Sequence, residues 1–311
     1  MKVDAIFTAD WHLMEKNPIC RKDDYTVTQF NKIDQIMALS KKHRAPIFIA
    51  GDIFDKWKPS PSLLRKALNH TMGPMVYAIA GNHDLPQHNM SQFDRSGLGV
   101  LTAGMSYVTM MDRVHEEGVI KDHVEEGAFA IHPFYFGTLP DEEYMKGLDK
   151  SVTNVALIHK FLYAPGDKKV FADVGDSGMR LLKKLKGFDL IVSGDNHQSF
   201  VLEHRGRKLV NPGSIGRTTA AQENHVPKVY LWDAATGQIK PHNLRCEQGV
   251  ISREHLDKRD DRDERITAFV ESFDDDLELD INFRKNITAF MKKNKIKKKV
   301  RNLVWEHVAD E

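Results

Sequence analysis

The sequence contains very little cysteine and no long uninterrupted hydrophobic segment. Only two cysteines, Cys20 and Cys246, occur in 311 residues, which excludes a disulfide-stabilised scaffold and a thiolate zinc site and is typical of a reducing compartment. The first hydrophobic run is interrupted by Asp4 and Asp10, and no later run is as long as a membrane span or a secretory signal. We therefore expect a cytoplasmic protein without a membrane partner.

The chain also has almost no net charge. Its formal charge is +1 at pH 7, so the total charge gives no argument for a nucleic-acid partner. Charge is concentrated locally instead: residues 292–301 are mostly lysine and arginine, whereas residues 257–264 and 274–280 are rich in aspartate and glutamate. Such runs indicate either the solvated faces of surface helices or, for the basic run, a contact with DNA.

What the chain does have is a hydrophobic content of 41%, which is enough for a large core. Hydrophobic residues recur at helical spacing over residues 25–43, and Ser60-Pro61 is typical of a helix start. Hydrophobic runs over 3–9, 46–50 and 75–80 alternate with these helices, which predicts parallel strands joined by right-handed crossovers. We expect an α/β domain over residues 1–250 and a small α-rich appendage over 251–311.

Two parts of the chain are less regular. Between residues 85 and 150 we expect edge strands and loops, built around short pieces such as 106–110 and 129–131. The appendage carries two narrow hydrophobic stripes that either pack against the main domain or dock a partner helix pair. The first stripe comprises Ile266, Phe269, Val270 and Phe273, and the second Ile281, Ile287, Phe290 and Met291.

Five of the expected strands end in residues that can bind a metal. These ends read Asp10-Trp11-His12, Gly51-Asp52, Gly81-Asn82-His83-Asp84, His159 and Gly194-Asp195-Asn196-His197. Each alone is ordinarily a cap, a turn or a structural histidine. Because ligand sites in α/β folds lie beyond the carboxyl ends of strands, the five together predict one site. Its mixture of nitrogen and oxygen ligands suits Mn²⁺, Fe²⁺ or Zn²⁺.

This ordered set resembles the calcineurin-like metallophosphoesterase superfamily over the greater part of the chain. The resemblance implies a metallophosphoesterase β-sandwich of mixed sheets flanked by helices. Three further blocks are similar to SbcD-type DNA repair exonucleases, in a reduced form such as a phage-encoded version. They are Asp10-Trp11-His12-Leu13, Gly51 to Asp55 followed by Pro59-Ser60-Pro61, and Asn211-Pro212-Gly213-Ser214.

The resemblance assigns a role to each strand-end residue. It implies two divalent ions, Mn²⁺ or Mg²⁺, about 3.5–4 Å apart, with Asp52 and a hydroxide bridging them. Asp10, His12 and His197 would complete the first metal, and Asn82, His159 and Asp195 the second. His83 would be the general acid that protonates the leaving oxygen, with Asp84 orienting its ring.

One position departs from the family pattern. Where the family has Gly-His-x-His, this chain has Gly194-Asp195-Asn196-His197, so a carboxylate replaces an imidazole. A carboxylate is a harder and more negatively charged ligand than an imidazole, but the aspartate side chain is shorter than that of histidine. Asp195 would then hold the second metal more loosely, or would lie behind the ligands and orient a neighbouring histidine.

Candidate substrate contacts are less specific. Arg217 can hold a phosphate by paired hydrogen bonds or can be an ordinary surface arginine. Lys56 and Trp57, with Lys58, can meet a nucleic-acid strand by charge and stacking, or can be ordinary loop residues.

The leading hypothesis is a metal-dependent DNA exonuclease or endonuclease that hydrolyses phosphodiester bonds. By resemblance it implies DNA as substrate, a homodimer, and a separate SMC-like ATPase subunit of the SbcC type. The alternative keeps the metals and changes the substrate, giving a phosphatase or phosphodiesterase acting on nucleotides or phosphoproteins. A non-enzymatic adaptor is the third reading, and the retention of His83 with the ligand types argues against it.

Overall fold

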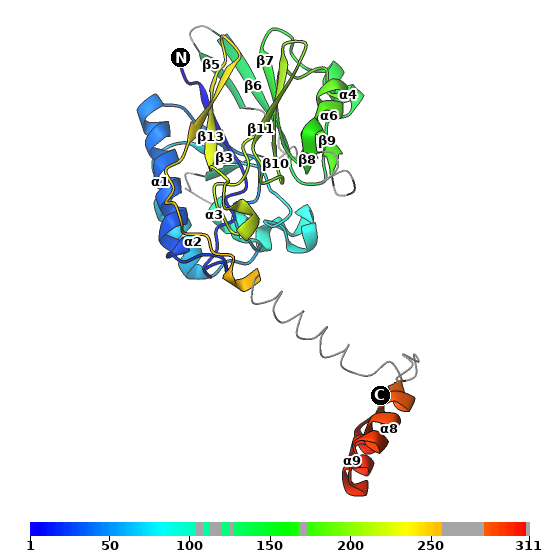
Figure 1. The fold of residues 1–311 in the computed structure, drawn as a ribbon. Coiled ribbons are helices and arrows are strands. Elements are labelled where there is room, and N and C mark those ends of the chain that lie inside the picture. Colours follow the sequence, from blue (N-terminus) through cyan, green and yellow to red (C-terminus); the bar gives the residue numbers. More distant parts are fainter. Residues whose placement is uncertain are drawn as a thin grey trace. The chain divides into compact units, whose positions relative to one another are not determined.

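The structure is a computed structural model, and it describes residues 1–103, 108–111, 120–124, 127–167, 173, 175–256 and 283–308. The chain divides into two compact units, Met1–Ser252 and Arg253–Glu311. The first unit contains two six-stranded sheets that face each other, with helices on their outer sides (Figure 1). A mixed α/β sandwich was the fold expected from the sequence, and it is confirmed.

The first sheet has the strand order β14-β13-β1-β2-β3-β4. The four strands from β1 to β4 are parallel, and β13 runs antiparallel beside β1. Its members are β1 (Ala5–Thr8), β2 (Ile47–Ile49), β3 (Val76–Ala78), β4 (Val108–Met110), β13 (Lys228–Asp233) and β14 (Gln238–Asn243). The parallel order of β1, β2 and β3 confirms the predicted crossovers.

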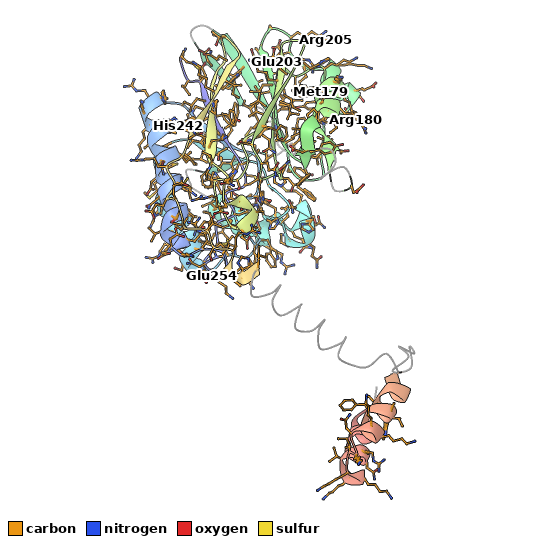
Figure 2. The ribbon with its side chains drawn as sticks, viewed as in Figure 1. Met179, Arg180, Glu203, Arg205, His242 and Glu254 are labelled. Carbon is orange, nitrogen blue, oxygen red and sulfur yellow. The ribbon has the colours of Figure 1, made fainter. Side chains whose placement is uncertain are left out.

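The second sheet has the order β11-β12-β10-β7-β6-β5. Its central strands β6, β7, β10 and β12 are parallel. The strands are β5 (Ile120–Val124), β6 (Gly127–Phe134), β7 (Thr153–His159), β10 (Leu190–Gly194), β11 (Phe200–His204) and β12 (Arg207–Asn211). Two short strands, β8 (Leu162–Tyr163) and β9 (Asp176–Ser177), pair beside it. The β11–β12 turn, marked by Glu203 and Arg205 in Figure 2, lies at the amino end of β12.

Alternating side chains divide the core into three layers. On β1, Phe7 points between the sheets while Ile6 points toward the outer helices, and on β7 Leu157 and Ile158 alternate in the same way. Strands buried on both faces read as continuous hydrophobic runs, which is why these strands could be recognised in the sequence. The two sheets are therefore fixed face to face, and the carboxyl ends of their strands are held at fixed distances from one another.

Helices cover the outer faces. The helices α1 (Tyr25–His43), α2 (Pro61–His70) and α3 (Gly97–Leu101) belong to the first half, and α4 (Glu142–Lys146) and α6 (Gly178–Lys184) to the second. The hydroxyl of Ser60 accepts the N–H of Leu63, and Pro61 takes the first helical position. This start of α2 was predicted from Ser60-Pro61 and is confirmed.

Two sequence expectations need correction. The stretch 85–150 was expected to hold edge strands and loops, but β6 spans eight residues and lies inside the second sheet between β5 and β7. His132 and Pro133 interrupt its hydrophobic pattern, so its length could not be read from sequence. The sequence also indicates a strand start at Gly187-Phe188, but β10 begins at Leu190.

The second unit is described for residues 283–308, which form α8 (Phe283–Lys293) and α9 (Lys298–Val308). Met291 is buried, whereas Phe290 is 47% exposed. Ile287 and these two residues keep the expected helical spacing. The first predicted stripe, Ile266 to Phe273, and Ile281 lie outside the described residues, as do both acidic runs.

Replacing Trp232 tests whether the layer between the sheets holds the sandwich together. The indole is 1% exposed, and its ring centroid lies 5.9 Å from Phe7 and 5.2 Å from Phe129 in the opposite sheet. Trp232→Ala should lower the free energy of unfolding by about 3–5 kcal/mol, as for other buried aromatic residues. Urea denaturation measures the loss.

The control is Met72→Ala, because Met72 is 54% exposed and its truncation should change stability by less than about 0.5 kcal/mol. Equal stability of Trp232→Ala and this control would contradict the described packing.

Candidate metal centre

The predicted ligands meet at the carboxyl ends of strands from both sheets. The loops after β1, β2 and β3 face the ends of β7 and β10. Among the described residues, carboxylate and imidazole atoms lying within 4.8 Å of one another form three overlapping groups: Asp10 with His12 and His197, Asp10 with Asp52 and His159, and His12 with Asp55 and His83. One constellation is therefore built by two sheets.

Several of these residues have left-handed backbone angles, which residues other than glycine rarely adopt. φ is +50° at Asp10, +43° at His12, +55° at Asp52 and +83° at Asp195. Such conformations cost of order 1–3 kcal/mol each and cluster at functional sites. Here they turn the chain sharply after each strand, which lets short side chains converge on one point.

The Asp52 carboxylate lies at the centre of the cluster. Its Oδ1 accepts a hydrogen bond from the backbone N–H of His83 at 2.9 Å, while Oδ2 lies 3.5 Å from Nε2 of His12 and 3.4 Å from Nε2 of His159. Burial opposes ionisation, but the charge of His159 holds the pKa of Asp52 below its ordinary value. An ionised oxygen placed between histidines of the two halves suits a ligand shared by two cations.

His159 is oriented by a main-chain carbonyl. Its Nδ1 donates to the carbonyl oxygen of Ala50 at 2.7 Å, and its Nε2 lies 3.0 Å from Oδ1 of Asn82. This arrangement is typical of histidines that ligate through Nε2. Burial opposes a charge on the ring, yet Asp52 raises the pKa of His159 to about 10. A proton on Nε2 therefore competes with a divalent ion for the same lone pair.

His12 and His197 face each other in the other half of the centre. Their Nε2 atoms lie 3.0 Å apart. Burial lowers the pKa of His12 to about 3, against the charge of Asp52, and burial also lowers the pKa of His197. Both imidazoles are thus neutral at pH 7, and neutral imidazole is the form that binds a metal.

Asp10 shows that a cation fits this half of the centre. Its Oδ1 accepts the N–H of Asp195 at 2.9 Å, but its Oδ2 is buried and has no hydrogen-bond partner among the described residues. An unsatisfied buried carboxylate oxygen is costly, and burial raises the pKa of Asp10 well above its ordinary value. A divalent ion beside Asp10, His12 and His197 would satisfy this oxygen and use both neutral rings.

Two glycines keep the ligands close together. A Cβ at Gly81 would lie 2.1 Å from Oδ1 of Asp52, and one at Gly194 would lie 2.0 Å from the carbonyl oxygen of Ala50. Neither space admits a methyl group, so glycine is required for the backbone to approach the ligands. The strand-end motifs therefore need their glycines as much as their carboxylates.

The prediction that Asp84 orients His83 is wrong. Asp84 is fully buried, and burial together with the charge of Asp52 raises its pKa to about 7. Its carboxylate accepts three backbone N–H groups of the surrounding loops, those of Ile53, Phe54 and Gly81. It therefore holds two strand-end loops together and is not available to the His83 ring.

Asp55 takes the place that was predicted for Asp84. Its carbonyl oxygen accepts a hydrogen bond from Nδ1 of His83 at 2.7 Å, and its carboxylate lies in one group with His12 and His83. The His83 ring is exposed and meets the His12 ring edge-on, with centroids 4.8 Å apart. Asp55 follows Asp52 by three residues, so its position in the Gly51 to Asp55 block was the only sequence indication of this role.

Asp195 lies beside the centre rather than within it. It joins none of the three ligand groups found in the described residues, although its backbone N–H fixes Asp10. Its side chain lines two cavities that open next to His197 and His159. This geometry does not favour a direct ligand, and the hydrogen bond that links Asp195 to the centre comes from its backbone rather than from its carboxylate.

Arg217 does not have the surroundings expected of a phosphate ligand. It is 2% exposed, and its two terminal nitrogens donate to the backbone carbonyl oxygens of Glu223 and Glu247. Through these hydrogen bonds Arg217 links the segment that contains Glu223 to the segment that contains Glu247. Lys56 is exposed and Trp57 is half-buried, directly after Asp55, so both remain predicted substrate contacts.

A shared carboxylate, neutral buried imidazoles and an exposed histidine at their edge define a metal-dependent phosphoesterase site. The sequence profile of the family described as calcineurin-like phosphoesterase matches residues 5–199, which include every predicted metal ligand. The chain therefore belongs to the calcineurin-like phosphoesterase family, whose members hydrolyse phosphoester bonds with divalent metals.

Solved structures match the chain at 12% sequence identity. An archaeal phosphodiesterase matches with a TM-score of 0.39, covering 77% of this chain and 99% of that one. A proposed 5′-nucleotidase from Staphylococcus aureus matches with a TM-score of 0.48, covering 80% of this chain and 54% of that one. The anchor protein of the Plasmodium inner membrane complex matches with a TM-score of 0.44, covering 80% of this chain and 90% of that one. No curated protein sequence matches the chain.

Metal content separates the role of Asp52 from that of Asp195. Asp52→Asn removes the charge shared by His12 and His159, so we expect most bound Mn²⁺ to be lost on dialysis. Asp195→Asn should retain its metal, because its side chain lies outside the ligand groups while its backbone N–H is kept. Elemental analysis of the dialysed proteins measures both. Loss of metal in Asp195→Asn, with retention in Asp52→Asn, would reverse the two assignments.

Proposed function

We propose that this phosphoesterase is a Mn²⁺-dependent DNA nuclease that cleaves backbone phosphodiester bonds, and that it serves as the nuclease subunit of an SbcCD-like complex in DNA repair, recombination or degradation. The observation that carries the proposal is the position of His83. It is an exposed histidine held beside the buried ligands by the Asp55 carbonyl. A deoxyribose oxygen is a poor leaving group unless it is protonated, and a histidine at this point can supply the proton.

The roles of the residues follow from their contacts. Because Nδ1 of His83 donates to Asp55, its other nitrogen, Nε2, is left to face a substrate. Asp52, His12 and His159 hold the cation positions, and Ala50 and Asp195 orient the ligands through their backbones. When bound, the metal ions supply an activated water and neutralise charge on the phosphoryl oxygens.

Support for DNA as the substrate comes from the residues around His83. Lys56 and Lys58 are exposed, and Trp57 lies between them as a half-buried aromatic residue. Positive charge beside an aromatic ring is typical of single-stranded nucleic-acid contacts. The described lysines of the run 292–301 are exposed as well, which suits either a solvated surface or a further contact with the phosphate backbone.

We propose residues 251–311 as the docking element for an SMC-like ATPase, and a homodimer as the working form. Phe290 on α8 is 47% exposed and neighbours the buried Met291, and an exposed aromatic residue on an amphipathic helix suits binding to a partner helix pair. No helix in the described ranges is long and hydrophobic enough to cross a membrane. A cytoplasmic location remains part of this proposal.

The direct test of the nuclease proposal is hydrolysis of linear double-stranded DNA in Mn²⁺, compared between the parent and His83→Ala. The variant should keep its metal and lose roughly 10²–10⁴-fold in turnover, as expected on removing a positioned acid. On methyl p-nitrophenyl phosphate the loss should be much smaller, because p-nitrophenolate leaves without protonation.

Two results would contradict this account. Loss of metal in His83→Ala would make His83 a ligand, which its grouping with His12 and Asp55 makes a concrete alternative. Hydrolysis of nucleoside monophosphates without any cleavage of DNA would support the nucleotide phosphatase instead.

Truncation after Ser252 tests the docking element. The unit Met1–Ser252 contains all proposed ligands and its own core, so the truncated chain should keep its metal content and its hydrolysis of methyl p-nitrophenyl phosphate. It should lose co-purification with the ATPase from the source cell. Phe290→Asp should cause the same loss in the full chain, whereas Lys299→Ala, at an exposed residue of α9, should not. Continued binding of the ATPase by the truncated chain would exclude this docking site.

A further inference from the structure

Two cavities open beside the metal centre and share two lining residues. The first has a volume of about 580 Å³ and includes His197 in its wall, and the second has a volume of about 490 Å³ and includes His159. Phe161 and Asp195 line both. Each volume lies within the range of roughly 300–1,000 Å³ that is usual for small-molecule sites. The centre is thus flanked by two separate spaces of comparable size.

The two cavities differ in chemistry. The first is lined largely by neutral hydrogen-bonding side chains, among them Gln198, Ser199, Thr219 and Asn224. The second combines hydrophobic side chains, Phe136 and Leu139, with charged ones, and its Lys160 is already paired with Asp176 at 2.8 Å. Amide and hydroxyl groups suit the edges of a nucleobase, whereas aromatic and aliphatic walls suit its faces.

Phe161 is fixed between the two spaces. Its carbonyl oxygen accepts the N–H of Asp176 at 3.0 Å, and the carbonyl oxygen of the next residue, Leu162, accepts Nδ2 of the buried Asn196 at 2.7 Å. Its ring lies so close to Gly175 that a Cβ there would be 2.3 Å from Cδ1. The ring is half-buried, so its orientation is set by the protein before any ligand arrives.

From this arrangement we infer that the substrate is a phosphodiester with a nucleoside-sized group on each side of the phosphate, one in each cavity, and that the Phe161 ring divides them and stacks on a base. The inference rests on the proposed phosphodiester hydrolysis and narrows its substrate class. A phosphomonoester would fill only one of the two cavities. Base stacking on an aromatic side chain corresponds to roughly 5- to 150-fold in binding.

The test compares two diesters, thymidylyl-(3′→5′)-thymidine and methyl p-nitrophenyl phosphate, in Mn²⁺. The ratio of kcat/KM for the dinucleotide to that for the small diester should fall at least tenfold in Phe161→Ala. Phe161→Tyr keeps an aromatic ring, so the ratio should stay at the parent value. Phe161→Leu keeps a hydrophobic side chain but no ring to stack on a base, so the ratio should fall as in Phe161→Ala. Glu203→Ala is the control, because Glu203 is exposed on β11 near the turn seen in Figure 2 and lines neither cavity.

A binding measurement keeps the result independent of turnover. Calorimetric titration with the phosphorothioate analogue of the dinucleotide, in Ca²⁺, should show the same weakening in Phe161→Ala at unchanged metal content. An unchanged ratio and unchanged binding in that variant would overturn the role of Phe161. A parent enzyme that prefers thymidine monophosphate to the dinucleotide would overturn the two-cavity assignment.

The outcome is separable from that of the nuclease proposal. Phe161-dependent cleavage of dinucleotides without cleavage of linear DNA would support this inference and refute the nuclease. Cleavage of linear DNA at an unchanged rate in Phe161→Ala would support the nuclease and refute this inference.

Discussion

The structure depends on a cluster of nitrogen and oxygen atoms that the two sheets hold within hydrogen-bonding distance of one another. Oδ2 of Asp10 is buried without a partner among the described residues, and the Nε2 atoms of His12 and His197 lie 3.0 Å apart. On the other side, the protonated Nε2 of His159 donates to Oδ1 of Asn82 at 3.0 Å. Each of these close contacts needs a proton or a cation between its two atoms. Divalent ions bound here would take the place of those protons and would also satisfy Oδ2 of Asp10.

Holding these atoms together requires both sheets. Asp10, His12 and Asp52 follow strands of the first sheet, whereas His159 and His197 follow strands of the second. The hydrophobic layer between the sheets, with Phe7, Trp232 and Phe129, therefore sets the distance between the two halves of the centre. The metal ligands depend on this packing and on the left-handed turns that follow the strands. The stability of the packed sandwich offsets the free energy needed to hold the ligands close together.

Much of this could be predicted from the sequence, because a strand buried on both faces is a continuous hydrophobic run and the polar residue after it marks the strand's end. The strand-end residues Asp10, His12, Asp52, Asn82, His159 and His197 were located in this way, and the family resemblance assigned them as ligands. Side-chain direction after a sharp turn was not predictable. Asp84 turns inward to three backbone N–H groups, Asp55 turns its carbonyl to His83, and Arg217 is buried against carbonyl oxygens. These outcomes depend on loops brought together only by the tertiary fold.

The central claim is that Asp52 joins two metal ions into one centre, and electron paramagnetic resonance of the protein loaded with two equivalents of Mn²⁺ tests it most directly. Two ions sharing the Asp52 carboxylate, about 3.5–4 Å apart, should give the spectrum of a spin-coupled pair. The temperature dependence of the signal should report that coupling. A spectrum of isolated, uncoupled Mn²⁺ ions at this loading would contradict the account.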